Sequence, residues 1–292
     1  MAIKEKTKMK KSNALTKRAL QSFFANKLAV IGGIIVIVMV VVSFCAPLLT
    51  SYDPAFIDVS SRKLPPSAEH LLGTDILGRD ILTRILYGGQ MSILIGVGSA
   101  LGACALGVIL GCLAGFFGGK VDSCLVFFQE LISTFPARLL TLLFIAFMGK
   151  STANLFIIFI FTGWPSVMRV VRGRIMSLKQ EPFVESCRVN GISSRSIMFH
   201  HLMPNTMGPI IVDATGSVAG YILAEAGLSY LNMGVPDNVA TWGSIINAAN
   251  RLDIIQNMPM LWVAPGIAIA LFVLSINFLG DGLRDALDPT SK

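Results

Sequence analysis

Residues 85–119 read ILYGGQMSILIGVGSALGACALGVILGCLAGFFGG, 35 consecutive residues without a charged side chain. An α-helix rises about 1.5 Å per residue, so about 20 apolar residues cross the hydrocarbon core of a bilayer. The stretch therefore predicts a membrane-spanning helix over about residues 90–117, with a connecting turn at each end. The whole 292-residue chain agrees, because 53% of it is hydrophobic and 14% charged, whereas a soluble domain has about 25% charged residues. This composition excludes a soluble or disordered protein and predicts an all-α polytopic membrane protein.

Five glycines in this stretch are spaced for helix packing. They are Gly98, Gly102, Gly107, Gly111 and Gly115. Small residues at every fourth position form one face of a helix and allow a second helix to approach closely. The competing interpretation, a phosphate-binding loop, needs the sequence G-x-x-x-x-G-K-[ST], which the chain does not contain. We therefore expect the glycines to pack against a neighbouring helix, and we expect no cofactor, ATP included, on this chain.

Five more apolar segments bring the expected number of spans to six. Residues 28–50 lie in an uncharged run, and Pro47 argues against cleavage of this segment as a signal peptide. The third segment contains Glu130 and Arg138, and the fifth contains Asp213 and Glu225. The six expected spans are residues 28–50, 90–117, 123–148, 152–168, 206–228 and 254–280.

The positions of the basic residues predict the orientation of these spans. Eight of the 24 Lys and Arg residues lie within residues 1–27, ahead of the first span. With the N-terminus inside, 17 basic residues fall on cytoplasmic segments and six on external ones, as the positive-inside rule requires. Both termini are therefore expected in the cytoplasm. Basic residues in this position flank a membrane span, and we expect no nucleic-acid partner.

The expected order along the chain has five parts. A basic cytoplasmic tail, residues 1–27, precedes the first transmembrane helix, residues 28–50. An external loop over residues 51–89 ends in a helix at residues 74–89, because Asp75–Arg79 and Asp80–Arg84 are acid–base pairs at the i,i+4 spacing. We expect that helix to lie on the membrane surface; the alternative is a folded loop without lipid contact. A five-helix core, residues 90–284, and a cytoplasmic tail, residues 285–292, complete the chain.

The long connection between the fourth and fifth spans, residues 169–205, has the pattern of a docking element. Pro182 suits the first turn of a helix, and Asn190-Gly191 suits its end, so residues 183–189 are expected to form a short helix that presents Glu185. Ser193 or Ser194 is expected to cap the next helix, which Pro204 would bend. A connection that only joins two spans needs a few residues, so this one is expected to bind another protein.

The same connection carries a sequence that resembles a known family. Glu185-Ser186-Cys187, Gly191 and the later Met203-Pro204 are similar to the Glu-Ala-Ala…Gly…Leu-Pro loop of the inner-membrane permease subunits of binding-protein-dependent ABC importers. Ser186, Cys187 and Met203 depart from the family residues by small or near-isosteric changes. The segments 70–80, 135–136, 225–231, 242–243, 265–266 and 280–289 further resemble the C-type permeases of dipeptide, oligopeptide and nickel importers.

The resemblance implies the type I importer fold in the bacterial inner membrane. It implies a second homologous permease, two cytosolic ATPases that bind ATP and Mg²⁺, and an external substrate-binding protein as partners, besides membrane lipid. The segment with Glu185, Ser186, Cys187, Gly191 and Pro204 would then couple the ATPase to the membrane helices. The expected cargo is di- or oligopeptides, with nickel or another metal chelate as the alternative. A self-sufficient channel and an intramembrane enzyme are the remaining rivals, and no catalytic residue is expected.

Four charged residues inside the expected spans are candidates for the translocation path, because an unpaired charge at the bilayer centre costs about 2.5–3.5 kcal/mol. Asp213 lies near the middle of its span. Glu130 has a structural alternative, a hydrogen bond to a neighbouring helix, and Glu225 has another, hydration at the outer end. Arg138, where the family usually carries an apolar residue, faces either the path or a partner. Adjacent His200 and His201 are poorly placed to share a metal ion, and no metal site is expected.

Overall fold

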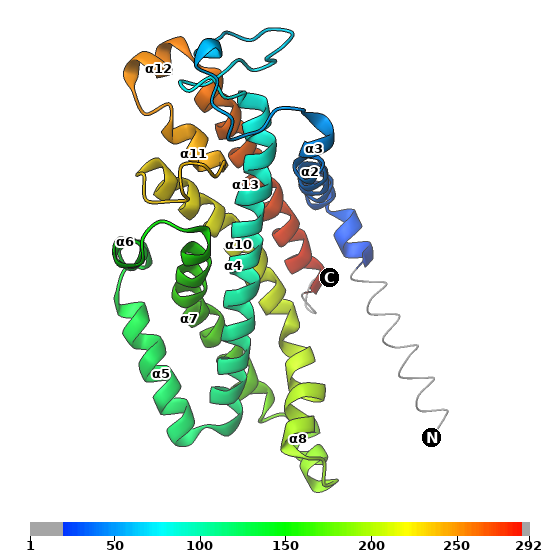
Figure 1. The fold of residues 1–292 in the computed structure, drawn as a ribbon. Helices are drawn as coiled ribbons and strands as arrows, with labels where there is room; N and C mark the ends of the chain where they lie inside the picture. The colour runs from blue at the N-terminus through cyan, green and yellow to red at the C-terminus, as the bar shows by residue number, and fades with distance from the viewer. Residues whose placement is uncertain (1–19, 288–292) are drawn as a thin grey trace.

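The computed structural model describes residues 20–287, and its regular structure is helical (Figure 1). Five helices are long and apolar enough to cross a membrane, and a sixth candidate is a pair of helices joined by a bend. The five are α2 (Lys27–Phe44), α4 (Ile81–Phe117), α7 (Thr152–Leu178), α10 (Met203–Tyr230) and α13 (Met260–Leu287). The bent pair is α5 (Gly119–Thr134) and α6 (Ala137–Met148). The basic residues before residue 20 and the end of the C-terminal tail lie outside the described residues.

The glycines of α4 form its contact with α7, which confirms the packing interpretation. A Cβ atom added to any of these glycines would meet α7. The pairs are Gly98 with Phe156, Gly102 with Ile160, Gly107 with Val167, Gly111 with Val171, and Gly115 with Ile175. Because the residue numbers increase together on both helices, α4 and α7 run in the same direction. The chain must therefore return along the bundle between them.

That return is made by α5 and α6, and the expectation of one straight span over residues 123–148 is wrong. The two helices meet at an angle of 86°. Phe135, between them, has an extended backbone (φ −89°, ψ 138°), because the residue before a proline disfavours the helical conformation. Pro136 then stands at the N-cap of α6. The Phe135-Pro136 pair thus turns the chain where the apolar pattern alone predicts a continuous helix.

The expected helix over residues 74–89 is also wrong in its first half, where the structure has a folded loop. Gly73 and Gly78 have positive φ angles of 78° and 81°, which glycine adopts at least cost. Thr74 and Asp80 pair as an isolated antiparallel bridge. The Asp80 carboxylate accepts a hydrogen bond from the Thr83 N–H at 2.7 Å and so caps α4. Helix α4 therefore begins at Ile81 and continues without a break into the membrane-spanning segment.

Ion pairs hold this loop in place, with one difference from the expected pairing. Asp75 and Arg79 do pair, at 2.7 Å between Oδ2 and Nε. Asp80 pairs with His70 rather than with Arg84, at 3.0 Å. The Arg84 side chain is 2% exposed; it lies 3.9 Å from Asp75 and donates a hydrogen bond to the Pro54 carbonyl oxygen at 3.1 Å. Buried charges need such partners, so the loop has a fixed shape on the end of the bundle opposite α8 (Figure 1).

Two further boundaries differ from expectation. Helix α7 extends to Leu178, so residues 169–178 belong to a helix and not to the following connection. The expected span over residues 254–280 is interrupted, because the short helix α12 (Leu252–Asn257) ends before Pro259 and α13 begins at Met260. Helix α13 packs against α2, where a Cβ on Gly32 would meet the Ser275 backbone.

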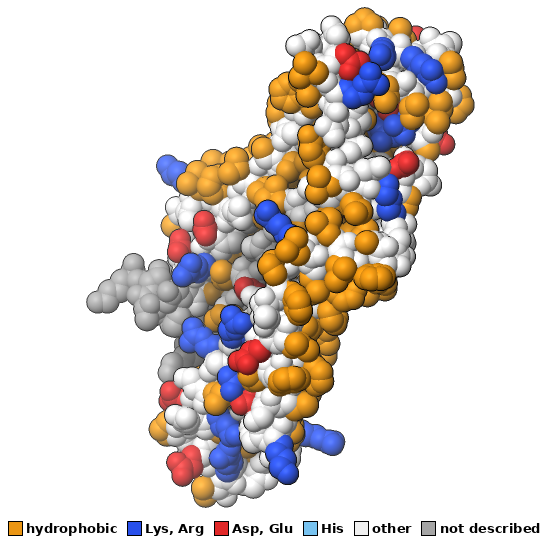
Figure 2. Space-filling view, turned by 90° about the vertical axis from the view of Figure 1, so that its left-hand side faces the viewer, with side chains coloured by type: hydrophobic (Ala, Val, Ile, Leu, Met, Phe, Trp, Pro, Cys, Tyr) orange, Lys and Arg blue, Asp and Glu red, His pale blue; other side chains and the backbone are white. Residues whose placement is uncertain are grey.

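Exposed apolar side chains cover the long helices. Figure 2 shows hydrophobic side chains in a nearly continuous strip along one side of the molecule, with charged side chains gathered toward both ends. On α2 the exposed set is Leu28, Ile31, Ile34, Ile37, Val38, Val41, Val42 and Phe44. An apolar surface of this extent suits contact with lipid or with another apolar protein surface.

Candidate functional site

The short helix expected around Glu185 is present as α8 (Pro182–Val189), which confirms that prediction. Pro182 occupies its first turn, and Gly191 follows it with φ +72°, the left-handed residue expected at its end. Val184 is completely buried and belongs to an apolar cluster with residues of α4 and α7. Glu185, Ser186 and Arg188 are exposed. The helix is therefore anchored by one face and presents a polar face to solvent.

The chain continues from α8 through a wide helical turn into α10. The Ser193 hydroxyl oxygen accepts a hydrogen bond from the Ser196 N–H at 3.3 Å, the cap expected from the sequence. Residues Ile197–Leu202 then form a π-helix, in which the Met203 N–H donates to the Met198 oxygen five residues earlier. Pro204 then stands in the first turn of α10, where its missing N–H is tolerated. The structure has a π-turn before it, and the bend expected at Pro204 stays a prediction.

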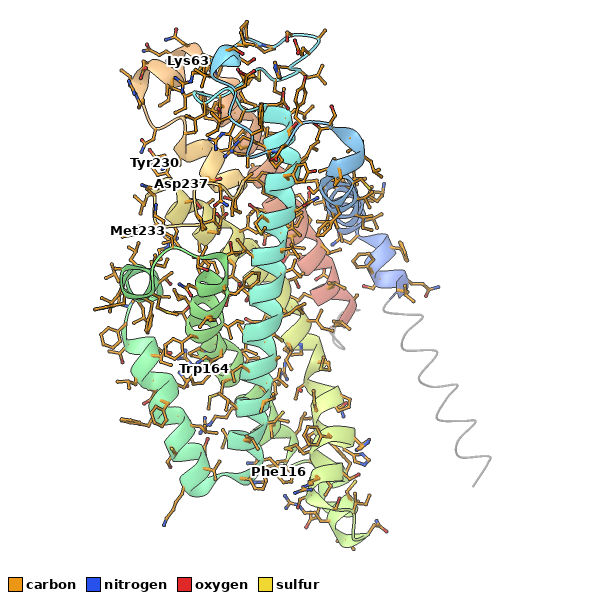
Figure 3. All side chains as sticks on the ribbon, viewed as in Figure 1. Lys63, Phe116, Trp164, Tyr230, Met233 and Asp237 are labelled. Atoms are coloured by element: carbon orange, nitrogen blue, oxygen red, sulfur yellow. The ribbon has the colours of Figure 1, made fainter. Side chains whose placement is uncertain are left out.

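Two contacts brace this end of the bundle. The Lys179 ammonium donates to the Phe116 carbonyl oxygen at 2.5 Å, where α4 ends, and lies 5.6 Å from the Phe116 ring centre. The Arg172 guanidinium donates to both carboxylate oxygens of Asp122 at 2.5 and 2.6 Å, and so joins α7 to α5. Figure 3 labels Phe116 near the end of the bundle that carries α8. The ends of α4, α5 and α7 that lie beside α8 are thus tied together.

A cavity of about 500 Å³ lies farther along the bundle, between α6, α7 and α10. Its polar lining consists of one cation, Arg138, and five hydroxyl side chains. The five are Thr141, Thr162, Ser166, Ser217 and Tyr221. A second cavity of about 390 Å³ shares Ala137, Thr162 and Ser166 with the first and is also lined by Arg169. The two volumes therefore adjoin.

Of the four charged path candidates, only Arg138 lines the larger cavity, and its side chain is exposed on the open side of that cavity. Glu130 is exposed on α5. Asp213 is half-buried, and its Oδ2 atom has no hydrogen-bond partner among residues 20–287. Its backbone oxygen accepts a hydrogen bond from Ser217, a cavity residue, at 2.8 Å. Asp213 thus lies one helical turn from the cavity lining.

Glu225 is completely buried, so the expectation that water surrounds it at the outer end is wrong in this structure. Its Oε1 atom accepts hydrogen bonds from Ser229 at 2.6 Å and Thr241 at 2.8 Å, and Ser92 donates to Oε2 at 3.5 Å. The Ser92 hydroxyl in turn accepts a hydrogen bond from the Trp242 backbone N–H at 3.1 Å. The carboxyl group joins α10, α4 and the start of α11 (Trp242–Asn247). The sequence gives no local sign of this network, since the donors lie up to 133 residues away.

Replacing Glu225 by Leu is expected to destabilise the protein by about 2–3 kcal/mol, because three buried hydroxyl groups lose their acceptor. Glu225→Gln, which keeps one acceptor oxygen, is expected to lose less. Thermal unfolding of the purified protein in detergent measures both. Glu130→Leu, at an exposed position, is the control and should change the melting temperature little. Equal melting temperatures for Glu225→Leu and the unmodified chain would contradict the structural role.

No group of three or more His, Cys, Asp or Glu side chains is placed to hold a metal ion within residues 20–287. His200 and His201 lie in the π-helix before α10. The five cysteines are all unpaired thiols. The described residues therefore offer hydroxyl groups and isolated charges rather than a cluster of metal ligands.

A helical bundle with five or six candidate spans, a largely apolar cavity that also carries Arg138 and hydroxyl groups, and an anchored helix at one end are the features of an integral membrane protein. Residues 107–292 match the family model described as "Binding-protein-dependent transport system inner membrane component". Residues 14–66 match the model of the "N-terminal TM domain of oligopeptide transport permease C". The chain belongs to this family of inner-membrane permeases, in the branch with the C-type N-terminal domain.

Curated relatives are similar over nearly the whole chain. The dipeptide transport system permease protein DppC of Alkalihalophilus pseudofirmus is 38% identical over 276 residues, which cover 94% of this chain and 90% of that protein. The oligopeptide transport system permease protein OppC of Bacillus subtilis is 36% identical and covers 96% of this chain and 91% of its own length. OppC of Haemophilus influenzae is 35% identical, with coverage of 96% and 90%.

Family membership confirms the resemblance and five expectations that follow from it. The chain is a multi-pass protein of the inner membrane and a transport permease. It is a non-catalytic component of its transport system, and the family binds no cofactor because the ATPase is a separate subunit. The chain works with the other components of a binding-protein-dependent system.

Proposed function

We propose that this permease passes di- or oligopeptides across the inner membrane and that α8 receives the driving motion. One geometric observation carries the mechanism: α7 and α10, the helices on either side of α8 in the chain, also line the 500 Å³ cavity. A displacement of α8 therefore moves two walls of the cavity. Three relatives that match more than nine-tenths of the chain are named as dipeptide or oligopeptide permeases, which favours peptides over nickel as cargo.

The coupling segment is proposed to comprise Glu185, Ser186, Cys187, Gly191 and Pro204, as the resemblance implies. Exposed Glu185 and Ser186 would contact the ATPase, while half-buried Cys187 packs on the apolar cluster below. Gly191 ends α8, and Pro204 follows the π-turn that leads to α10. Closure of two ATPases would then move α8 as a lever, and rigid helices would carry the motion to the cavity.

The proposed topology has six spans with both termini in the cytoplasm. Because α4 and α7 run in the same direction, the α5–α6 segment is counted as a crossing between them. Six crossings place the two ends of the chain on one side, and the distribution of Lys and Arg favours the cytoplasm. The loop held by Asp75 and Arg84 would then face outward and α8 inward. The N-terminal tail is proposed to be residues 1–27, whereas residues 285–287, expected in the C-terminal tail, belong to α13.

The proposed assembly contains this chain, a second homologous permease, two cytosolic ATPases that bind ATP and Mg²⁺, and an external substrate-binding protein. The apolar surface of the long helices supplies area for both lipid and the second permease. The half of the translocation path contributed by this chain is proposed to be the wall that contains Arg138, with Asp213 beside it. Glu130, exposed on α5, is proposed to face either the path or the second permease.

Reconstitution of the complete complex in vesicles tests the proposal. With ATP inside and binding protein outside, labelled tripeptides are expected to accumulate, and labelled nickel is not. Vesicles without ATP give the background. Accumulation of nickel but not of peptide would replace the proposed cargo by the metal alternative. Peptide flux through the isolated chain, without the ATPases, would contradict the coupled mechanism altogether.

A further inference from the structure

Arg138 is a cation without a structural purpose inside the chain. Within residues 20–287 no acidic side chain lies at ion-pair distance from its guanidinium group. It stands in the first turn of α6, where a positive charge is unfavourable for the helix because of the macrodipole. Neither an ion pair nor helix stability therefore explains an arginine at this position.

The position of the cavity along α7 and α10 argues against a lipid headgroup as the partner of Arg138. Thr162 and Ser166, on the facing wall, lie 10 and 14 residues after the start of α7 at Thr152, or about 15–21 Å along the helix axis. Tyr221 and Ser217 lie 9 and 13 residues before the end of α10 at Tyr230, about 14–20 Å from it. Both helices thus place the cavity near the middle of a hydrocarbon core about 30 Å thick.

The cavity offers acceptors for N–H groups beside this one cation. The Thr141, Thr162 and Ser217 hydroxyls donate to backbone oxygens of their own helices. Their oxygen atoms therefore remain available as acceptors. No Asp or Glu side chain lines the cavity. Acceptor oxygens with a single unpaired guanidinium suit a solute that carries amide N–H groups and a carboxylate.

We infer that Arg138 is a specificity-determining residue that meets side-chain carboxylate groups of the cargo as they pass the middle of the membrane. The inference rests on the proposed peptide permease and adds a charge preference to it. Arginine is suited to this role because it stays charged when desolvated and presents a planar fork to a carboxylate. Arg169, on α7, lines the adjoining cavity. The two cavities together therefore contain two cations, Arg138 and Arg169.

The test compares two peptides that differ in one side chain, Ala-Glu-Ala and Ala-Lys-Ala, in vesicles that contain the complete complex. The binding protein is the same in every arm, so its own preference cancels when ratios of uptake are compared between variants. Arg138→Gln is expected to lower the Ala-Glu-Ala to Ala-Lys-Ala ratio about fivefold, and Arg138→Glu to lower it further. Arg138→Lys, which keeps the charge, should retain most of the preference.

Arg251→Gln is the matched control, since it removes an exposed arginine that pairs with Asp253 outside the cavity; it should leave the ratio unchanged. An equal loss of both peptides in Arg138→Gln would overturn the inference in favour of a structural role. Loss of the second permease during purification of Arg138→Gln would assign Arg138 to the subunit interface instead. If the unmodified complex takes up neither peptide, the peptide cargo fails, and the inference fails with it.

Discussion

Replacing Glu185 by Arg is expected to stop ATP-driven uptake while the membrane bundle stays folded. Glu185 lies in the first turn of α8, exposed to solvent. Truncation of one partner of a desolvated charge pair at an interface costs about 2–5 kcal/mol, and charge reversal adds repulsion. Because every 1.4 kcal/mol is a factor of ten, we expect the ATPase to bind at least about thirtyfold more weakly. Co-purification of the ATPases and peptide uptake by reconstituted complexes measure the two effects.

The fold should survive this change, because the contacts that hold α8 are made by other residues. Val184, on the buried face of α8, is completely buried among residues of α4 and α7. The chain leaves α8 through the left-handed Gly191, whose backbone N–H donates to the Arg188 oxygen and not to Glu185. The melting temperature of Glu185→Arg in detergent should therefore stay close to that of the unmodified chain.

Glu69→Arg is the matched control for Glu185→Arg. It makes the same substitution at an exposed glutamate in the loop at the opposite end of the molecule. It should leave ATPase binding unchanged. If Glu185→Arg assembles and transports normally, α8 is not the coupling element. If Glu69→Arg releases the ATPases instead, the proposed orientation in the membrane is inverted.

The elements that the sequence predicted correctly depend on short-range signals. Pro182 and Gly191 mark the ends of α8 through backbone preferences that act within a few residues, and both positions agree with the structure. The glycine spacing on α4 predicts close packing because one helix face is visible from sequence alone. It does not identify α7 as the partner, since nothing local at Gly111 specifies Val171.

The errors have two different physical origins. At Phe135-Pro136 a local signal existed, but the apolar pattern outweighed it, and the bend between α5 and α6 was missed. At Glu225 no local signal existed, because its donors Ser92 and Thr241 are brought together only by the packing of three helices. The loop at residues 74–80 combines both origins. The i,i+4 spacing of its charged residues is a local signal that favours a helix. The actual partner of Asp80 is His70, which lies ten residues earlier in the chain.

The second large effect is expected from Gly111→Leu, which should prevent the protein from reaching its normal packed state. A Cβ atom at this position would lie 2.7 Å from the Val171 Cβ and 2.9 Å from the Met168 backbone oxygen. Backbone atoms cannot rotate away, so α4 and α7 must separate. Overpacking of a core typically costs about 1–3 kcal/mol, and we expect at least the upper end of that range. Yield of monodisperse protein and thermal unfolding in detergent measure the loss.

Gly173→Leu, on the partner helix, is the control for this prediction. Gly173 is exposed on α7, and an added Cβ would meet nothing within 4 Å. Leucine also has a better helix propensity than glycine by up to about 1 kcal/mol, so this variant should be at least as stable as the unmodified chain. Equal stability of the two leucine variants would mean that α4 and α7 do not pack through the glycine face.

A smaller substitution at the same position separates folding from coupling. Cys112, which follows Gly111, and Val171, which faces it, belong to the same apolar cluster as Val184 of α8. A larger distance between α4 and α7 would therefore weaken the packing of Val184, the residue that anchors α8.

Gly111→Ala adds one methyl group, so the bundle should still form, but motion of α8 should be transmitted less completely to the cavity. We expect this variant to hydrolyse ATP in the assembled complex while importing fewer peptides per ATP than the Gly173→Ala control. An unchanged ratio of import to hydrolysis would show that the α4–α7 contact serves stability alone.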